Sequence, residues 1–149
     1  RHQGIELEGR FALRDNLVVS ANWTLARHRY ANNPALARVA IQGNDIDTAP
    51  RSMGGLQVNW APTERVSGDL EWVHTGPYFT NPENTNRYPG HDLVNLRSSL
   101  ALTDVWQVFF RVTNLLDTDY AERADYAFGN ERFFVGEPRG VYIGFRRSN

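Results

Sequence analysis

Two stretches of the chain combine aromatic rings with arginine, residue types suited to binding an anionic ligand that carries aromatic groups. Aromatic rings stack on planar groups and on cations, and guanidinium groups form charge-assisted hydrogen bonds with anions. The alternative is that these side chains only stabilise the loops in which they lie. The candidates for ligand contact are Tyr78, Phe79, Arg87 and Tyr88 in one stretch, and Tyr126 and Arg132, beside Phe128, Phe133 and Phe134, in the other.

Other chemistry finds little support in the residues. The chain has no cysteine, which excludes disulfides and thiolate metal sites. The histidines His2, His28, His74 and His91 show no i, i+4 pair and no metal-ligand spacing. The segment 117–119 contains two aspartates but lacks the glycine and glutamate of a calcium loop. We therefore predict no metal, no cofactor and no catalytic site.

The composition excludes further classes of protein. The formal net charge of −1 gives no general attraction to nucleic acid, so no nucleic-acid partner is predicted. A transmembrane helix is excluded because no run of about eighteen apolar residues is present. Residues 1–4 include neither an initiator Met nor a signal-peptide pattern, and we therefore expect the chain to begin inside a longer protein.

The dominant pattern along the chain is an alternation of apolar and polar residues with a period of two. Such alternation predicts strands with one dry face and one wet face. No helical periodicity competes with it over a comparable length, so the sequence predicts an all-β, antiparallel protein. Seven segments carry the pattern, at residues 5–13, 17–25, 56–60, 66–72, 94–102, 106–113 and 141–146.

The connections between these segments alternate in length. Residues 14–16, 61–64 and 103–104 make short connections, whereas the long ones span about 30–51, 76–91 and 114–139. In an up-and-down meander this places every short turn at one rim and every long loop at the other. That asymmetry is typical of a transmembrane outer-membrane β-barrel, with periplasmic turns and extracellular loops. The alternative is a soluble sandwich, which more often has similar turns at both ends.

The arginines provide an independent test of the barrel. An arginine that faces lipid near the bilayer midplane costs about 2–4 kcal/mol, so arginines in mid-strand should lie on the polar face. The polar face carries Arg146, whereas Arg27 and Arg147 share the apolar face at strand ends, from which they reach headgroups or water. The charged residues of the polar parity that we predict to face the lumen are Glu6, Glu8, Arg10, Glu71, Arg97 and Arg111, where they are solvated or paired with one another unless a partner fills the lumen.

Aromatic residues occur where a membrane protein would place its girdles. Trp60 and Trp106 lie on the apolar parity close to short turns, which predicts an inner aromatic girdle. Tyr30, Tyr78 and Phe79 lie where strands meet long loops and are candidates for the outer girdle. The alternative is that the aromatics fill a soluble core. Two aspartates of the first long loop, Asp45 and Asp47, receive no predicted role.

Seven strands do not complete a barrel. Bacterial single-chain barrels have an even number of strands from eight upward. Seven strands would leave two unpaired edges in lipid, which is not viable. We therefore expect further strands to precede residue 1, and an odd count to place the two termini at opposite rims.

Two late motifs resemble the TonB-dependent receptors. Residues 112–117, Val-Thr-Asn-Leu-Leu-Asp, followed by Tyr120, resemble the family's Asn-Leu-Phe-Asp-x-x-Tyr signature, and residues 138–146 resemble its final strand. Residues 4–8 match a common strand opening. The pattern itself marks Asn114 and Asp117 as turn formers, whose side chains bond their own backbone. Family members usually end in an aromatic residue, whereas this sequence ends in Asn149.

The resemblance implies that residues 1–149 are the C-terminal segment of a barrel of about 22 strands, filled by an N-terminal plug domain that the lumen-facing charges would contact. It implies outer-membrane lipid around the barrel, a siderophore or similar ligand at the outer loops, and the TonB complex acting through the plug and its TonB box. The implied function is active uptake of ferric siderophores or another scarce nutrient across the bacterial outer membrane. The alternative is a passive porin-like or structural barrel without a plug.

Overall fold

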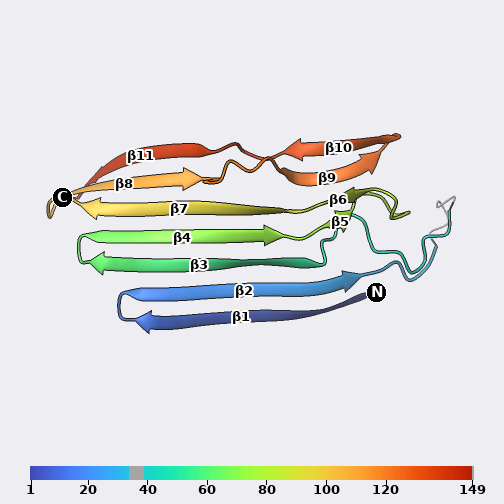
Figure 1. Cartoon of the computed structure of the whole chain (residues 1–149), viewed down its shortest axis with the longest axis horizontal. Coiled ribbons are helices and arrows are strands. Elements are labelled where there is room, and N and C mark those ends of the chain that lie inside the picture. The colour runs from blue at the N-terminus through green and yellow to red at the C-terminus, as the bar shows by residue number, and fades with distance from the viewer. Residues whose placement is uncertain (34–38, 149) are drawn as a thin grey trace.

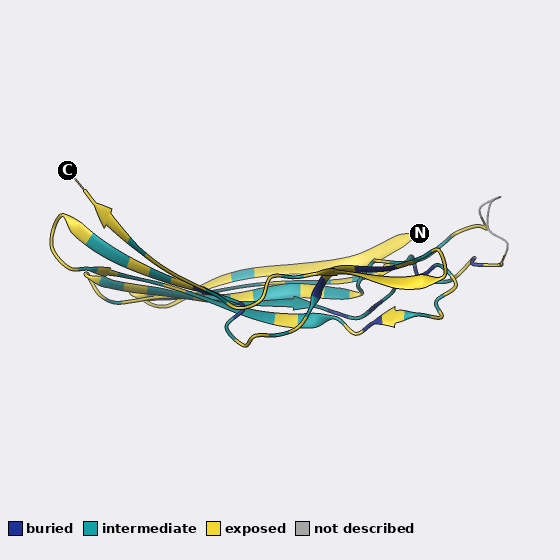
Figure 2. Ribbon diagram, turned by 90° about the horizontal axis from the view of Figure 1, so that it is seen from above, coloured by how far each residue is buried: buried dark blue, intermediate teal, exposed yellow. Residues whose placement is uncertain are grey.

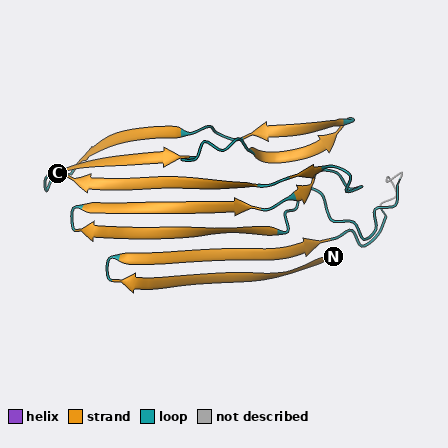
Figure 3. Ribbon diagram, viewed as in Figure 1, coloured by secondary structure: helices purple, strands orange, loops and turns teal. Residues whose placement is uncertain are grey.

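All regular structure in the described part of the chain is β (Figure 3). The computed structural model describes residues 1–33 and 39–148, so Asn149 lies outside the described residues. No helix in these residues is long and apolar enough to cross a membrane. Two small hairpins pair β5 (Tyr78–Phe79) with β6 (Arg87–Tyr88), and β9 (Ala121–Ala127) with β10 (Asn130–Val135). One large sheet contains β1 (His2–Arg14), β2 (Leu17–His28), β3 (Ser52–Thr63), β4 (Val66–Thr75), β7 (His91–Ala101), β8 (Trp106–Thr113) and β11 (Gly140–Arg147).

The strands of the large sheet are paired in chain order, and every pair is antiparallel (Figure 1). β1 and β11 form its two edges. This arrangement confirms the predicted up-and-down meander of seven strands. The observed strands extend the predicted segments mainly at their outer ends, where β2 runs on to His28 and β3 begins at Ser52.

The register gathers the apolar residues on one face of the sheet. Residues directly opposite each other in an antiparallel pair share a face, and Leu7 lies opposite Trp23 on the apolar side. On the other side, Asp69 lies opposite Arg97. We call these two sides the apolar face and the polar face. The predicted alternation is therefore confirmed across the whole sheet.

The two ends of the sheet differ in their connections. All three short turns lie at one end, here called the turn end, and all three long connections lie at the other, the loop end (Figure 1). Residue 1 lies at the loop end and the last strand finishes at the turn end, as an odd strand count predicts. The hairpins β5–β6 and β9–β10 form inside the second and third long connections, and the period-two pattern did not reveal them.

The turn that follows β8 contains the two predicted turn formers. Asn114 and Asp117 have positive φ angles of 49° and 56°, a conformation that these residue types tolerate. The Asn114 side-chain oxygen accepts a hydrogen bond from the backbone N–H of Thr118 at 2.9 Å. The Asp117 carboxylate accepts one from the backbone N–H of Arg139 at 3.2 Å. The predicted bond from the side chain to the backbone of its own turn is confirmed for Asn114, whereas the Asp117 side chain bonds Arg139, 22 residues away, instead.

The large sheet is a single layer, and no second layer formed by the described residues packs on either of its faces (Figure 2). Side chains on the apolar face stay open, and Ile5, Phe11 and Phe145 are 64%, 61% and 68% exposed. Buried residues gather mainly at the loop end, where Tyr78, Tyr88, Ala121 and Ala124 form one cluster. A soluble sandwich would cover the apolar face, whereas a barrel wall leaves it open for lipid.

Aromatic side chains mark both ends of the apolar face. Trp60 and Trp106 lie beside the turn end, where the sequence predicts an inner girdle, and are 53% and 45% exposed. Near the loop end, the ring of Trp23 stacks on His74 at 5.0 Å and on Trp72 at 5.9 Å between centroids. We call Trp23, Trp72 and His74 the aromatic row.

Candidate functional site

The loop end is organised by two tyrosines that join the hairpins. Tyr78 and Tyr88 are directly opposite each other in the β5–β6 hairpin, with ring centroids 5.2 Å apart. The Tyr78 hydroxyl accepts a hydrogen bond from the backbone N–H of Ala124 at 2.8 Å, and the Tyr88 hydroxyl accepts one from Ala121 at 3.0 Å. Burial raises the pKa of the Tyr78 hydroxyl. Both candidate ligand residues are thus buried under β9, and the outer-girdle position predicted for Tyr78 is wrong.

Three other predicted ligand residues leave their side chains accessible. Arg87 is exposed and Phe79 is half-buried beside it in the same hairpin, where both line a hollow of about 210 Å³. Tyr126 of β9 is 38% exposed. The structure brings Phe79 and Arg87 together and places Tyr126 on the neighbouring hairpin. Their contact with a ligand stays a prediction.

Arg132 is held by a carboxylate of its own hairpin. Its Nε donates a hydrogen bond to Asp125 at 2.7 Å, and Arg123 lies 2.9 Å from the other oxygen of Asp125. The hydrogen bond from Arg132 holds the pKa of the Asp125 carboxyl below its usual value, aided by the charge of Arg123. Arg132 therefore fixes the β9–β10 hairpin, and Asp125 is a residue that the sequence pattern did not single out.

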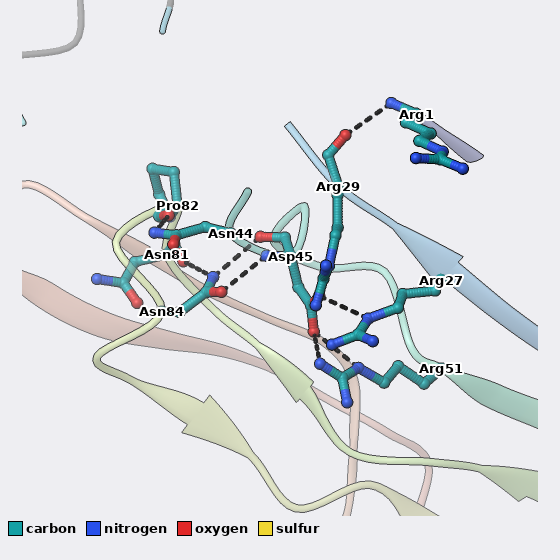
Figure 4. A network of polar contacts seen from close by, with 9 residues as sticks. All are labelled: Arg1, Arg27, Arg29, Asn44, Asp45, Arg51, Asn81, Pro82 and Asn84. Carbon is teal, nitrogen blue, oxygen red and sulfur yellow. Dashed lines mark hydrogen bonds and ion pairs between the residues drawn. The ribbon is translucent and has the colours of Figure 1, made fainter. Parts of the chain in front are cut away.

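The first and second long connections are clasped together by an asparagine. The Asn84 side chain accepts a hydrogen bond from the backbone N–H of Asp45 at 2.8 Å and donates one to the Asp45 carbonyl at 2.9 Å (Figure 4). Asn81 shapes the turn that presents Asn84, because its side-chain oxygen accepts hydrogen bonds from the backbone of Thr85 and Asn86. We call the Asp45–Asn84 pair the loop clasp.

The polar face carries an ion-pair network near its middle. Arg97 lies 3.2 Å from Asp69 and 3.5 Å from Glu71. Gln57 donates to Asp69 at 2.6 Å, and Asn95 donates to Glu71 at 3.0 Å. Two of the predicted lumen residues, Glu71 and Arg97, thus pair with each other.

The remaining lumen candidates share this face without joining the network. Glu6, Glu8 and Arg10 lie on the edge strand β1 and are exposed, with no ion pair among the described residues. Arg111 stands over the ring of Tyr142 at 4.4 Å, a cation–π contact that the sequence did not reveal. A hollow of about 850 Å³ lies over this face and is lined by Asp69, Arg97 and Arg111 among others.

The histidines form pairs rather than a metal centre. The rings of His2 and His28 meet on the polar face with their Nδ1 atoms 2.7 Å apart. His74 lies 2.8 Å from Asp92, and His91 hydrogen-bonds the Tyr88 hydroxyl at 2.9 Å. In the described part of the chain, no group of three or more metal-ligating side chains comes together.

Several solved structures share this fold. The siderophore receptor PiuA from Acinetobacter baumannii matches with a TM-score of 0.84 at 16% identity. The ferric yersiniabactin uptake receptor FyuA from Yersinia pestis matches with 0.82 at 20% identity, and the ferric citrate transporter FecA with 0.80 at 22%. These matches cover 99%, 98% and 99% of this chain but 22%, 23% and 24% of those proteins, in the same order. The chain thus spans under a quarter of their length.

The sequence also matches a family model described as TonB dependent receptor-like, beta-barrel, over residues 1–115. The matched range contains β1 through β8 and therefore most of the large sheet. It confirms the resemblance that the late motifs indicated, on a mostly different part of the chain. The chain belongs to the TonB-dependent receptor β-barrel family, whose members are receptors and transporters of the bacterial outer membrane rather than enzymes.

Proposed function

We propose that residues 1–149 form the C-terminal segment of the barrel of a receptor that actively imports ferric siderophores or a chemically similar scarce nutrient. The observation that carries the proposal is family membership combined with similar structures named for siderophore, ferric yersiniabactin and ferric citrate uptake. Transport by such a receptor is driven by the TonB complex acting on a plug domain inside the barrel.

The polar face is the part of the chain that would meet the plug. Arg97, Glu71 and Asp69 offer both signs of charge to a partner, beside the hollow of about 850 Å³. On the edge strand, Glu6, Glu8 and Arg10 are unpaired among the described side chains and offer further contacts. A passive pore would instead leave this face to water.

The loop end is the part that would meet the ligand. Arg87 supplies a guanidinium for an anionic group, while Phe79 and Tyr126 supply accessible aromatic surface. In this proposal the buried Tyr78 and Tyr88 support these residues through β9, and Arg132 supports them through Asp125.

Uptake by the full-length protein tests the proposal. Cells that carry it as their sole receptor should accumulate radioactive iron from ferric siderophores, and an uncoupler or deletion of TonB should abolish accumulation. Active transport needs an energy source, whereas diffusion through a pore does not. Accumulation that persists without TonB would favour the passive porin.

Two variants test whether Arg87 contacts the ligand. Arg87→Gln should weaken ferric-siderophore binding by roughly tenfold or more, because it removes a charge-assisted hydrogen bond. The matched control is Arg65→Gln, which changes an exposed arginine in a short turn at the opposite end of the sheet. Equal affinities for Arg87→Gln and the parent protein would remove Arg87 from the site.

A further inference from the structure

Two histidines meet at the loop end of the polar face. His2, at the start of β1, lies directly opposite His28, at the end of β2, where the two strands run side by side (Figure 1). Their Nδ1 atoms are 2.7 Å apart and their ring centroids are 4.9 Å apart. We call His2 and His28 the histidine pair. Spacing in the sequence did not reveal the pair, because its members are 26 residues apart and only strand pairing brings them together.

The register of the two strands holds the rings together. Arg1 and Arg29, the next opposed residues, exchange both backbone hydrogen bonds, at 2.7 Å and 2.8 Å. Hydrogen-bonded and non-hydrogen-bonded pairs alternate along an antiparallel ladder, so His2 and His28 form a non-hydrogen-bonded pair. The Cα atoms of such a pair are about 4.5 Å apart, and the side chains are closer than in a hydrogen-bonded pair. The backbone therefore positions the two imidazoles before any ligand binds.

The histidine pair is open to solvent on the lumen side. His2 is exposed and His28 is half-buried. The next opposed residues on the polar face are Gly4 and Ala26, and neither has a side chain long enough to cover the rings. A small solute in the lumen therefore reaches both imidazoles.

The guanidinium groups nearest in the chain are turned away from the pair. Arg27 and Arg29 flank His28, so the alternation of the strand places them on the apolar face. There their Nε atoms lie 3.7 Å and 3.6 Å from the Asp45 carboxylate (Figure 4). A cation that approaches from the lumen therefore meets the imidazole rings rather than these guanidinium groups.

The distance between the two Nδ1 atoms matches two adjacent positions around a metal ion. A metal–imidazole bond is about 2.0–2.1 Å long, so two bound nitrogens are about 2.9 Å apart at a right angle and about 3.4 Å apart at the tetrahedral angle. The observed 2.7 Å is closest to the right angle, which Cu²⁺ prefers in its square-planar complexes. Imidazole suits Cu²⁺, and a given site binds Cu²⁺ more tightly than Ni²⁺ or Zn²⁺.

We propose that the histidine pair binds Cu²⁺ at the outer mouth of the lumen, through Nδ1 of each ring, with water completing the coordination. Without the metal, one ring donates its Nδ1 proton to the other. On binding, that ring carries its proton on Nε2 instead, so both imidazoles stay neutral and no net proton is released. Two protein ligands, where structural metal centres have four, make this an exchangeable site. It goes beyond siderophore uptake, whose proposed contacts lie on the hairpins β5–β6 and β9–β10.

Titration of the metal-free, full-length protein in detergent with copper(II) chloride tests the proposal, followed by calorimetry and electron paramagnetic resonance. The parent protein should bind one more equivalent of Cu²⁺ than the double variant His2→Gln with His28→Gln, with a spectrum of two coordinated imidazole nitrogens. His28→Gln alone should weaken binding at this site by at least about tenfold, since even losing a residue that only orients a metal ligand costs that much. Equal stoichiometry and equal spectra for the parent protein and the double variant would overturn the proposal.

A histidine on the other face of the sheet supplies the matched control. His74 pairs with Asp92 on the apolar face, and His74→Gln should bind Cu²⁺ like the parent protein. Loss of the copper equivalent in this variant would move the site to the aromatic row and overturn the proposal.

Chemical modification of the unaltered protein gives a test that does not depend on the folding of a variant. Diethyl pyrocarbonate acylates accessible imidazole nitrogens, so Cu²⁺ should slow the modification of His2 and His28 but not that of His74. Peptide mass spectrometry measures the rate at each histidine. Equal rates at His2 and His28 with and without Cu²⁺ would contradict the copper site.

Discussion

At the scale of single residues, the sequence located side chains on the sheet better than side chains in the loops. A strand side chain has only two choices of face, so alternation alone placed Glu71 and Arg97 together on the polar face. In the loops, Tyr78 was predicted from its residue type to contact a ligand, yet its hydroxyl is taken by the backbone of Ala124. Asp45 escaped notice because its partners converge only after β2 and β3 have paired.

The pH dependence of the β9–β10 hairpin follows from Asp125. Because Arg132 and Arg123 lower the pKa of this carboxyl, its contribution to stability is present above the usual pKa near 4 and is lost as the pH falls through the lowered value. Hydrogen exchange of residues 121–135 in the full-length protein, corrected for intrinsic rates, should therefore remain slow at pH 5 and accelerate well below pH 4.

Asp125→Asn provides the comparison for this experiment. The variant should exchange faster than the parent protein at neutral pH and lose the acid step, because the amide carries no charge for Arg132 to pair with. An acid step of the same size in the variant would assign it to another group.

At the scale of elements, the long strands were predictable and the hairpins were not. A strand of ten or more residues shows its period several times over, whereas β5 and β6 have two residues each and show none. The β9–β10 hairpin was hidden for another reason. All six residues of β10 are exposed, so its sequence carries no alternation of buried and open positions.

The aromatic row depends on a glycine in β3. A Cβ added to Gly54 would collide with the ring of Trp23 and the carbonyl of Asn22, so Trp23 lies directly over this residue. Gly54→Ala should push Trp23 away from His74 and destabilise the full-length protein by about 1–3 kcal/mol, the usual cost of overpacking. Denaturant unfolding followed by tryptophan fluorescence measures the change.

Gly68→Ala is the matched control for Gly54→Ala. Gly68 lies in β4, and an added Cβ there would meet its nearest heavy atoms at 3.9 Å, an ordinary contact distance. This variant should leave the free energy of unfolding nearly unchanged. Equal destabilisation by both substitutions would mean that the loss comes from backbone effects of alanine rather than from Trp23.

At the scale of the whole molecule, topology could be predicted because connection lengths and strand order carry the same information. Three short turns and three long loops leave one simple arrangement for seven consecutive strands, and the sheet adopts it. The docking of the loops on one another could not be predicted. It depends on hydrogen bonds between a few side chains and backbone groups far apart in the chain, such as Tyr88 and Ala121.

The isolated segment should not behave as a soluble protein. Its apolar face is open, and β1 and β11 each leave one edge of backbone N–H and C=O groups unpaired in the described sheet. Such edges and faces drive aggregation in water. Residues 1–149 expressed alone should aggregate without detergent in size-exclusion chromatography with light scattering. A monodisperse monomer that unfolds cooperatively in plain buffer would contradict the membrane assignment.

The loop clasp joins two loops that come together only when the strands between them have paired. Asp45 and Asn84 are 39 residues apart, and the strands β3 and β4 lie between them in the chain. Contacts of such long separation form late, after the intervening hairpin has closed. Formation of the clasp therefore indicates that β3 and β4 have paired in the native register. A spectroscopic label at the clasp would report when this late step of folding into the membrane occurs.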